Sequence, residues 1–165
     1  GRISEYANKF TGSIFTKSEP EPSSNGLWGV NVDVALPCAT QNEINGEEAK
    51  MLAANNVIAV AEGANMPCTP EAVEIFHQNG ILFAPGKASN AGGVATSGLE
   101  MSQNSLRLSW SREEVDSRLQ KIMVDIHKNA FDTAEKYGFP GDYVAGANIA
   151  GFLKVAEAMT AQGLI

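Results

Sequence analysis

Glycines, small polar side chains and a single lysine gather in one stretch of the sequence, residues 85–104. A short apolar run at 81–83 precedes this stretch and a strongly helical region follows it, as expected where a strand passes through a tight loop into a helix. Glycine allows backbone to approach a ligand closely, and the first turn of a helix offers unpaired N–H groups. Residues 85–104 therefore predict a loop that binds a ligand, with a helix from Leu99 onward.

Two more segments, residues 37–43 and 62–67, combine Ala, Asn and Pro with other small or polar residues directly after predicted strands. The carboxyl ends of parallel strands meet at one edge of a sheet, where open α/β sheets bind ligands. Each segment alone is better interpreted as a turn, because Gly, Asn and Pro are common turn residues. Three such segments in register favour a binding site built from hydrogen bonds and close backbone approach.

Several side chains in these segments could contact a ligand. Asn65 and Asn90 each offer two donors and an acceptor, which suits an amide or a ribose hydroxyl, although an isolated Asn is more often a turn residue. Lys87 could balance an anionic group, but a lone lysine is usually solvated and the spacing of a phosphate-binding loop is absent. Ser97 has no histidine close in the sequence, so it is interpreted as a hydroxyl donor rather than a nucleophile.

Other ionisable residues are interpreted as structural. We expect three glutamates to cap helices or to bind loop amides rather than to act as acids or bases. They are Glu43, Glu62 and Glu100. His77 and His127 fall on predicted helices away from the loops. Cys38 and Cys68 lack metal-ligand spacing, so we expect two semi-buried free thiols and no metal site.

The first half of the chain alternates helices and strands. Apolar spacing predicts a helix over residues 2–10, a brief strand at 13–16 and an exposed loop at 17–26. Three apolar runs predict strands that are buried on at least one side. They lie at residues 30–36, 57–61 and 81–83.

Two helices with clear start signals separate these strands. Asn45 and Glu48 fit a capping box that opens a helix over residues 46–54. Thr69, followed by a proline, caps a second helix that ends near Gly80. Strands and helices that alternate through short links indicate parallel pairing through right-handed crossovers, so the sequence predicts an α/β fold with a parallel sheet.

A helical region completes the chain. Ser111 and Glu114 fit a capping box at the start of a long helix that ends at Gly138. Asp142 caps a last helix, in which small residues such as Gly146 permit close packing against a neighbour. We expect these helices to form a layer on the sheet.

Composition limits the class of protein. The chain has 165 residues, is 44% hydrophobic and carries a formal net charge of −7, which suits one compact domain with a helical appendage and argues against binding of nucleic acid. No apolar run approaches the roughly 20 residues of a membrane span, so we expect a soluble, cytoplasmic protein. The sequence starts without Met inside a predicted helix, as an excerpt of a longer chain would.

The order of strands and helices resembles half of a dinucleotide-binding fold. The fingerprint of that fold, Gly-x-Gly-x-x-Gly, is absent from the sequence. Either the ligand is not a dinucleotide or the first half of the fold lies upstream. Five blocks resemble, in order, the C-terminal part of hexameric glutamate dehydrogenase, in the Glu/Leu/Phe/Val dehydrogenase superfamily. They are residues 36–43, 61–67, 85–88 with 90–94, 97–101 and 146–152.

This resemblance implies the second half of an NAD(P)-binding Rossmann-like domain over residues 1–90. Residues 91–165 would then be C-terminal helices that pack on the sheet and toward an absent substrate domain. The implied reaction is the reversible oxidative deamination of L-glutamate to 2-oxoglutarate and ammonia, with NAD or NADP, in a homo-hexamer.

The resemblance also implies roles for residues. Val94 and Ser97 would bind the substrate, with the Ser97 hydroxyl bonded to the side-chain carboxylate of glutamate. The residues implied to line the cofactor crevice are Ala39, Thr40, Asn65 and Asn90, of which Asn90 would lie close to the nicotinamide. The family's catalytic Lys and Asp and its phosphate-binding loop would lie upstream of Gly1, so this chain holds no catalytic residue and the isolated chain is expected to be inactive.

One alternative belongs to another class of function. The chain could be a binding or assembly module whose exposed sheet edge awaits a missing half. The residues that would meet the 2′ position of the dinucleotide lie outside the sequence, so it does not distinguish NAD from NADP.

Overall fold

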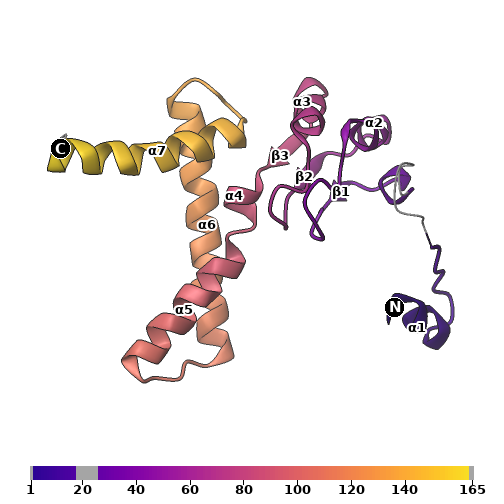
Figure 1. Ribbon diagram of the computed structural model, residues 1–165, viewed down its shortest axis with the longest axis horizontal. Coiled ribbons are helices and arrows are strands. Elements are labelled where there is room, and N and C mark those ends of the chain that lie inside the picture. Colours follow the sequence, from indigo (N-terminus) through magenta and orange to yellow (C-terminus); the bar gives the residue numbers. More distant parts are fainter. Residues whose placement is uncertain (1, 18–25, 164–165) are drawn as a thin grey trace.

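Three short parallel strands form an open sheet at the centre of the fold (Figure 1). The computed structural model describes residues 2–17 and 26–163. Strands β1 (Val34–Ala35), β2 (Ala59–Ala61) and β3 (Leu82–Ala84) lie in chain order and pair in parallel. The predicted α/β fold, a partial parallel sheet followed by C-terminal helices, is confirmed, although each strand is shorter than its predicted run.

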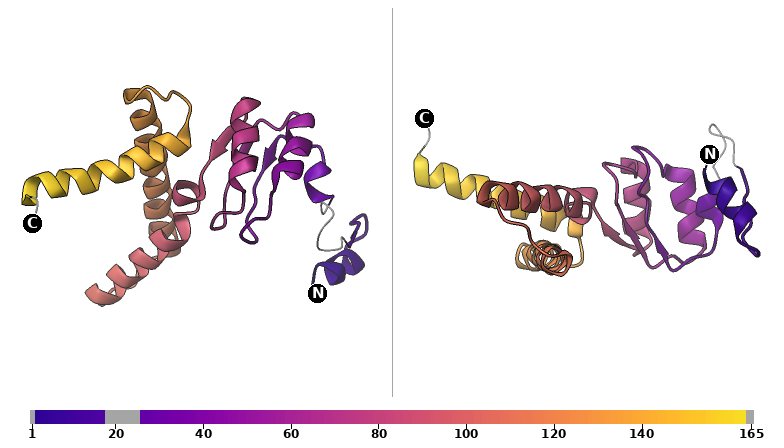
Figure 2. Two further views of the ribbon diagram at one scale, coloured as in Figure 1. Left: turned by 45° about the horizontal axis from the view of Figure 1, so that its top comes forward. Right: turned by 90° about the horizontal axis from the view of Figure 1, so that it is seen from below.

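Helices α2 (Gly46–Ala54) and α3 (Pro70–Gln78) connect the strands and lie side by side (Figure 2). The Asn45 side chain accepts a bond from Glu48 N at 3.1 Å, and the Glu48 carboxylate accepts one from Asn45 N at 2.9 Å. The Thr69 hydroxyl accepts a backbone N–H in the first turn of α3. Both predicted caps are confirmed, so local sequence signals decide where these helices begin.

Strand register places one row of side chains in the hydrophobic core. Ala35, Val60 and Phe83 lie opposite one another on the three strands and are buried. Val34 and Leu82, on the other face, are 46% and 56% exposed. Other buried members of the same core come from the helices and their connections: Ile44, Leu52 and Phe76. The first strand is therefore buried on its Ala35 side, and α2 and α3 cover only one face of the sheet.

The N-terminal segment follows the prediction only in part. Helix α1 (Arg2–Lys9) forms as expected. Residues 13–16 form no strand, because no strand among the described residues pairs with them. Most of the predicted loop at 17–26 lies outside the described residues. A 3-10 helix, η1 (Leu27–Gly29), then contacts α2, and its Trp28 is buried in the core.

Residues 85–104 are almost entirely helical, which corrects the predicted loop. One residue separates β3 from α4 (Gly86–Ser89), and two separate α4 from α5 (Gly92–Leu106). Helix α5 thus begins seven residues before the predicted start at Leu99. A Cβ at Gly86 would lie only 2.8 Å from the carbonyl oxygen of Ala64. The glycines therefore indicated close approach correctly at Gly86, but the predicted loop is wrong, because residues 86–89 and 92–106 are helical.

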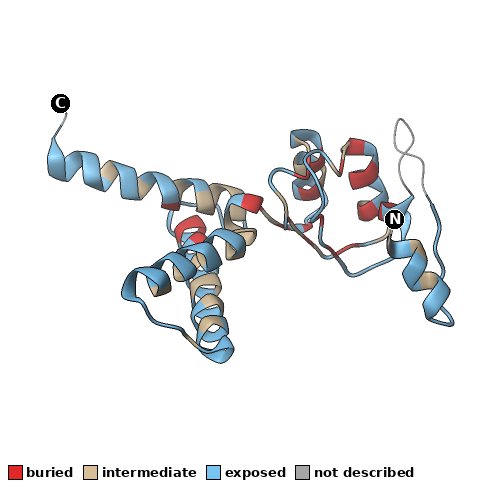
Figure 3. Ribbon diagram, turned by 60° about the horizontal axis from the view of Figure 1, so that its bottom comes forward, coloured by how far each residue is buried: buried red, intermediate tan, exposed pale blue. Residues whose placement is uncertain are grey.

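Helices α6 (Arg112–Lys136) and α7 (Tyr143–Gln162) extend from the β3 side of the sheet (Figure 1). Ser111 caps α6, but the Glu114 carboxylate binds Arg118 at 2.9 Å rather than completing the predicted capping box. Buried residues concentrate around the sheet and where α6 meets α7 (Figure 3). In the described parts of the chain, no helix combines the length and apolar character needed to cross a membrane.

The contact between α6 and α7 includes a position that only glycine fits. A Cβ at Gly146 would overlap the carbonyl oxygen of Ala130 and lie 3.1 Å from the Cβ of Ala134. Both alanines are buried, so the neighbours have little room to move. The predicted close packing is confirmed at Gly146, whereas a Cβ at Gly151 would meet nothing within 4 Å.

Gly146→Ala is expected to lower the free energy of unfolding by about 1–3 kcal/mol, because the added methyl forces α6 and α7 apart. Gly151→Ala, in the same helix, is the matched control and should be neutral or stabilising by up to about 1 kcal/mol. Chemical denaturation of the two variants measures the difference. Equal unfolding free energies would contradict the packing argument.

Candidate functional site

The loops that follow the strands meet at one edge of the sheet, as predicted. Asn42 N donates to Met66 O at 3.0 Å, and Gly63 N donates to Pro37 O at 2.9 Å. A Cβ at Gly63 would overlap the exposed Cys38 thiol, so a side chain there would require that thiol to rotate away.

Glu43 shapes the first loop, which carries Ala39 and Thr40. One oxygen of its carboxylate accepts bonds from Ala39 N at 2.9 Å and from Thr40 N at 3.3 Å. Ala39 and Thr40 are both exposed at the edge of the sheet. The structure thus confirms that Glu43 binds loop amides.

Asn65 and Asn90 come together from the second and third loops. The Asn90 side-chain nitrogen donates to Ala64 O at 3.1 Å and to Asn65 Oδ1 at 2.6 Å. Because a carbonyl can only accept, these bonds fix which way both amides point. No bond between described residues uses Asn90 Oδ1 or Asn65 Nδ2, so the pair presents one free acceptor and one free donor.

Glu62 is the buried carboxylate beneath this pair, with 6% of its surface exposed. Its Oε2 accepts a bond from Gly86 N at 2.5 Å, and its Oε1 accepts one from Cys68 N at 3.1 Å. The ion pairs among the described residues involve other groups. Backbone N–H groups, rather than a cation, therefore offset the negative charge, which confirms the predicted role for Glu62.

Glu100 corrects the prediction for the third glutamate. It lies inside α5, where its carboxylate accepts a bond from Asn104 Nδ2 at 3.4 Å. It neither caps a helix nor binds a loop amide. The reason is that α5 begins at Gly92, which moves Glu100 from the expected helix start into the helix interior.

Val94 and Ser97 lie on α5 and are exposed, Val94 by 73%. The Ser97 hydroxyl donates to Gly93 O at 3.3 Å, a local bond within the helix that a stronger acceptor could replace. These two residues lie one to two turns beyond Asn90 along the chain. The structure brings the two asparagines together but does not place Val94 or Ser97 in contact with them.

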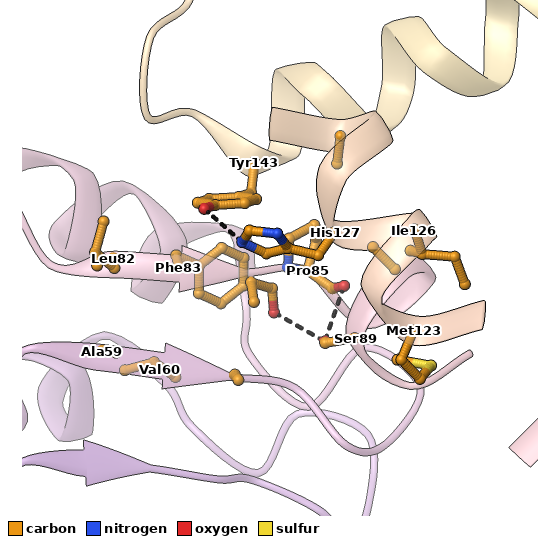
Figure 4. A pocket seen from close by; sticks show the side chains of 14 residues that line it. Ala59, Val60, Leu82, Phe83, Pro85, Ser89, Met123, Ile126, His127 and Tyr143 are labelled. Atoms are coloured by element: carbon orange, nitrogen blue, oxygen red, sulfur yellow. Dashed lines mark hydrogen bonds between the residues drawn. The ribbon is translucent and has the colours of Figure 1, made fainter. Parts of the chain in front are cut away.

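A cavity of about 340 Å³ opens between the strands and α6, away from these residues (Figure 4). Its lining is mostly apolar and includes Phe83, Met123 and Ile126. At its rim His127 Nε2 and the Tyr143 hydroxyl form a hydrogen bond of 3.0 Å. None of the six residues implied to bind ligands lines this cavity.

Sequence reasoning missed two features of the third loop. The Ser89 hydroxyl lies within 3.1 Å of three carbonyl oxygens, those of Glu62, Ala84 and Pro85, and so fastens α4 to the strand ends (Figure 4). Lys87, considered above as a ligand for an anion, binds Asn148 Oδ1 on α7 at 2.5 Å. The bonds from Ser89 to Glu62 and from Lys87 to Asn148 join residues 27 and 61 apart in the sequence, so no local signal could have shown them.

The two cysteines differ in environment, which corrects the prediction of two semi-buried thiols. Cys38 is exposed and Cys68 is buried, and both are free thiols. Burial raises the pKa of the Cys68 thiol, and the neighbouring charge of Glu62 raises it further, so this thiol stays protonated at neutral pH. Within the described ranges no group of three or more His, Cys, Asp or Glu residues could hold a metal ion.

Comparisons with known proteins cover the whole of this architecture. The family model of Glutamate/Leucine/Phenylalanine/Valine dehydrogenase matches residues 1–163. The chain is 57% identical over 168 residues to the NAD(P)-specific glutamate dehydrogenase of Xylanibacter ruminicola, a match covering 99% of this chain and 35% of that protein.

Solved structures agree with this match. The crystal structure of Plasmodium falciparum glutamate dehydrogenase matches with a TM-score of 0.89 and 48% identity, over 100% of this chain and 34% of that one. The hetero-hexameric glutamate dehydrogenase of Thermus thermophilus matches with a TM-score of 0.77 and 26% identity, over 99% of this chain and 37% of that one. The chain thus spans about a third of the length of these relatives. Because the family model matches nearly every residue, the chain belongs to the Glutamate/Leucine/Phenylalanine/Valine dehydrogenase family.

Proposed function

We propose that this chain is part of a glutamate dehydrogenase that interconverts L-glutamate and 2-oxoglutarate with release or uptake of ammonia. The observation that carries the proposal is the Asn65–Asn90 pair at the carboxyl ends of the strands, in a chain similar to glutamate dehydrogenases over its whole length. NAD or NADP, when bound, supplies the hydride acceptor for the deamination.

The asparagine pair fits the carboxamide of a nicotinamide. A primary carboxamide carries a C=O acceptor and an NH₂ donor, and the pair presents the complementary donor, Asn65 Nδ2, and acceptor, Asn90 Oδ1. The exposed Ala39 and Thr40 border the same edge of the sheet and line the proposed cofactor crevice. Residues 1–90 would thus be the second half of the dinucleotide-binding domain.

Substrate binding is assigned to α5. The Ser97 hydroxyl, bonded only weakly to its own helix, would donate to the side-chain carboxylate of glutamate, and Val94 would contact the substrate's aliphatic chain. Both residues are exposed, so we propose that the opposite wall of this pocket, with the catalytic Lys and Asp, comes from parts of the protein outside these 165 residues. Residues 91–165 would then pack toward that substrate domain.

The cofactor, assembly and location of the complete protein are also proposals. A relative named NAD(P)-specific supports NAD or NADP without choosing between them, and a hetero-hexameric relative supports a hexamer. The two free thiols are compatible with a reducing compartment such as the cytoplasm.

A binding or assembly module is the second candidate function. Apolar side chains on or beside the strands are strongly exposed, among them Ile58 at 62% and Leu82 at 56%. Such a surface suits coverage by another protein segment. This candidate predicts self-association and no dinucleotide binding.

Asn65→Ala tests the carboxamide contact. In the complete protein that carries this chain, loss of the free donor should weaken binding of NAD and NADP about two- to tenfold, the worth of a neutral hydrogen bond. Asn104→Ala, which removes an exposed amide bonded only to Glu100, is the control and should have no effect. Calorimetric titration measures both, and equal affinities in the two variants would remove Asn65 from the crevice.

Ser97→Ala should lower kcat/KM for glutamate about 10- to 150-fold, because a hydrogen bond to a charged group is worth about 1.5–3 kcal/mol. Ser102→Ala is the matched control, since its hydroxyl makes the same kind of bond to the carbonyl four residues back in α5. Steady-state kinetics with saturating dinucleotide measures the ratio. Unchanged glutamate kinetics in Ser97→Ala would exclude the assigned role.

The chain of residues 1–165 produced alone is expected to show no glutamate-dependent reduction of NAD or NADP, because the proposed catalytic residues lie elsewhere. The complete protein, assayed in parallel, serves as the positive control. Measurable turnover by the pure chain would refute this expectation. Saturable dinucleotide binding by the chain would favour a residual site, and self-association without binding would favour the assembly module.

A further inference from the structure

Two glutamates of this chain, Glu48 and Glu62, are equally buried, each with 6% exposure, but they serve different purposes. Glu48 closes a capping box within α2 and so holds residues that are already neighbours in the sequence. Glu62 instead uses one oxygen for Cys68 N and the other for Gly86 N, 24 residues away. Its carboxylate therefore joins the second loop to the start of α4.

This arrangement requires a carboxylate rather than an amide. Both oxygens of Glu62 accept bonds from backbone N–H groups, so neither position suits a donor. A glutamine of the same shape would turn its NH₂ group toward one of the two N–H groups. Glu62→Gln would therefore disturb either Cys68 N or Gly86 N without changing the volume of the side chain.

A short structural path leads from Glu62 to the asparagine pair. A Cβ at Gly86 would lie 3.1 Å from Glu62 Oε2, 2.8 Å from Ala64 O and 3.6 Å from Asn90 Nδ2, so these three groups surround Gly86. Asn90 N donates to Gly86 O at 2.9 Å. Any shift of Gly86 therefore moves Asn90 relative to Ala64 and Asn65, the groups that orient its amide.

We propose that Glu62 is a positioning residue for dinucleotide binding: its carboxylate holds Gly86 N and thereby fixes the Asn65–Asn90 pair in the orientation that receives the nicotinamide carboxamide. Glu62 is buried below the pair and does not itself reach the ligand. This inference rests on the proposed function, because it takes the asparagine pair as part of the cofactor site.

The test compares Glu62→Gln with Glu48→Gln in the complete protein that carries this chain. Glu62→Gln should weaken binding of NAD or NADP at least about fivefold by calorimetry and raise the KM for dinucleotide to match, while the KM for glutamate stays within about twofold. Glu48→Gln, which replaces an equally buried carboxylate that bonds only within the capping box of α2, should lower the unfolding temperature without changing the dinucleotide affinity. Thermal unfolding confirms that each variant is folded at the assay temperature.

A double-mutant cycle separates positioning from general destabilisation. If Glu62 acts through the pair, Asn65→Ala should cost less in the Glu62→Gln background than in the unmodified protein, whereas its cost should be unchanged in the Glu48→Gln background. Gly86→Ala, which inserts a methyl between Glu62 and Ala64, should reproduce the loss of affinity and serves if Glu62→Gln does not fold. Additive effects, or equal dinucleotide affinity in the Glu62 and Glu48 variants, would overturn the inference.

The outcomes also distinguish this inference from the proposed function. Dinucleotide binding that depends on Glu62, without turnover of glutamate by the unmodified protein, would refute the proposed reaction and leave the positioning role standing. Failure of the unmodified protein to bind any dinucleotide would overturn both.

Discussion

The buried carboxylate of Glu62, bonded to backbone N–H groups, joins the loops at the carboxyl edge of the sheet. Removing the charge of Glu62 from water is costly, and the protein offsets that cost with two backbone N–H groups from different segments. Because charge-assisted bonds are short and directional, they fix where β2 ends and where α4 begins. The same geometry favours glycine at position 86, because a Cβ there would lie too close to the Glu62 carboxylate and to the Ala64 carbonyl oxygen.

The parallel sheet imposes a second constraint, which is that its two faces differ. Register aligns Ala35, Val60 and Phe83 on the face that joins the core with α2 and α3, and it aligns Val34 with Leu82 on the other. On that second face, part of the surface lies open and part borders the apolar cavity beside α6 (Figure 4). The helices that follow β3 leave the sheet at its edge, so the fold combines a well-packed face with one that has an incomplete covering.

Local signals predicted the parts of the structure that neighbouring residues decide. The capping box of Asn45 and Glu48 and the parallel order of the strands could be read from the sequence, because caps and crossovers depend on short spacings. The bond between His127 and Tyr143 could not, because it joins residues 16 apart in the sequence. The helicity of residues 92–98 could not either, because glycine and small polar residues are weak helix formers. The assignment of six residues to ligand binding is a proposal from family resemblance, and the structure adds that two of them, Asn65 and Asn90, are hydrogen-bonded to each other.

Three ionisable side chains near the loops make hydrogen bonds that hold the structure. Both oxygens of Glu62 accept backbone bonds, Glu43 binds two loop amides, and Lys87 is bonded to Asn148. Each of these groups is engaged in holding the structure, whereas a general acid or base must be free to exchange a proton with the substrate. The free groups of the Asn65–Asn90 pair are neutral amides, which can orient a ligand but cannot accept its proton, and Cys38 in the first loop is an exposed free thiol. Holding reactants in position is itself a large part of catalysis, and under the proposed function it is the part that these loops would contribute.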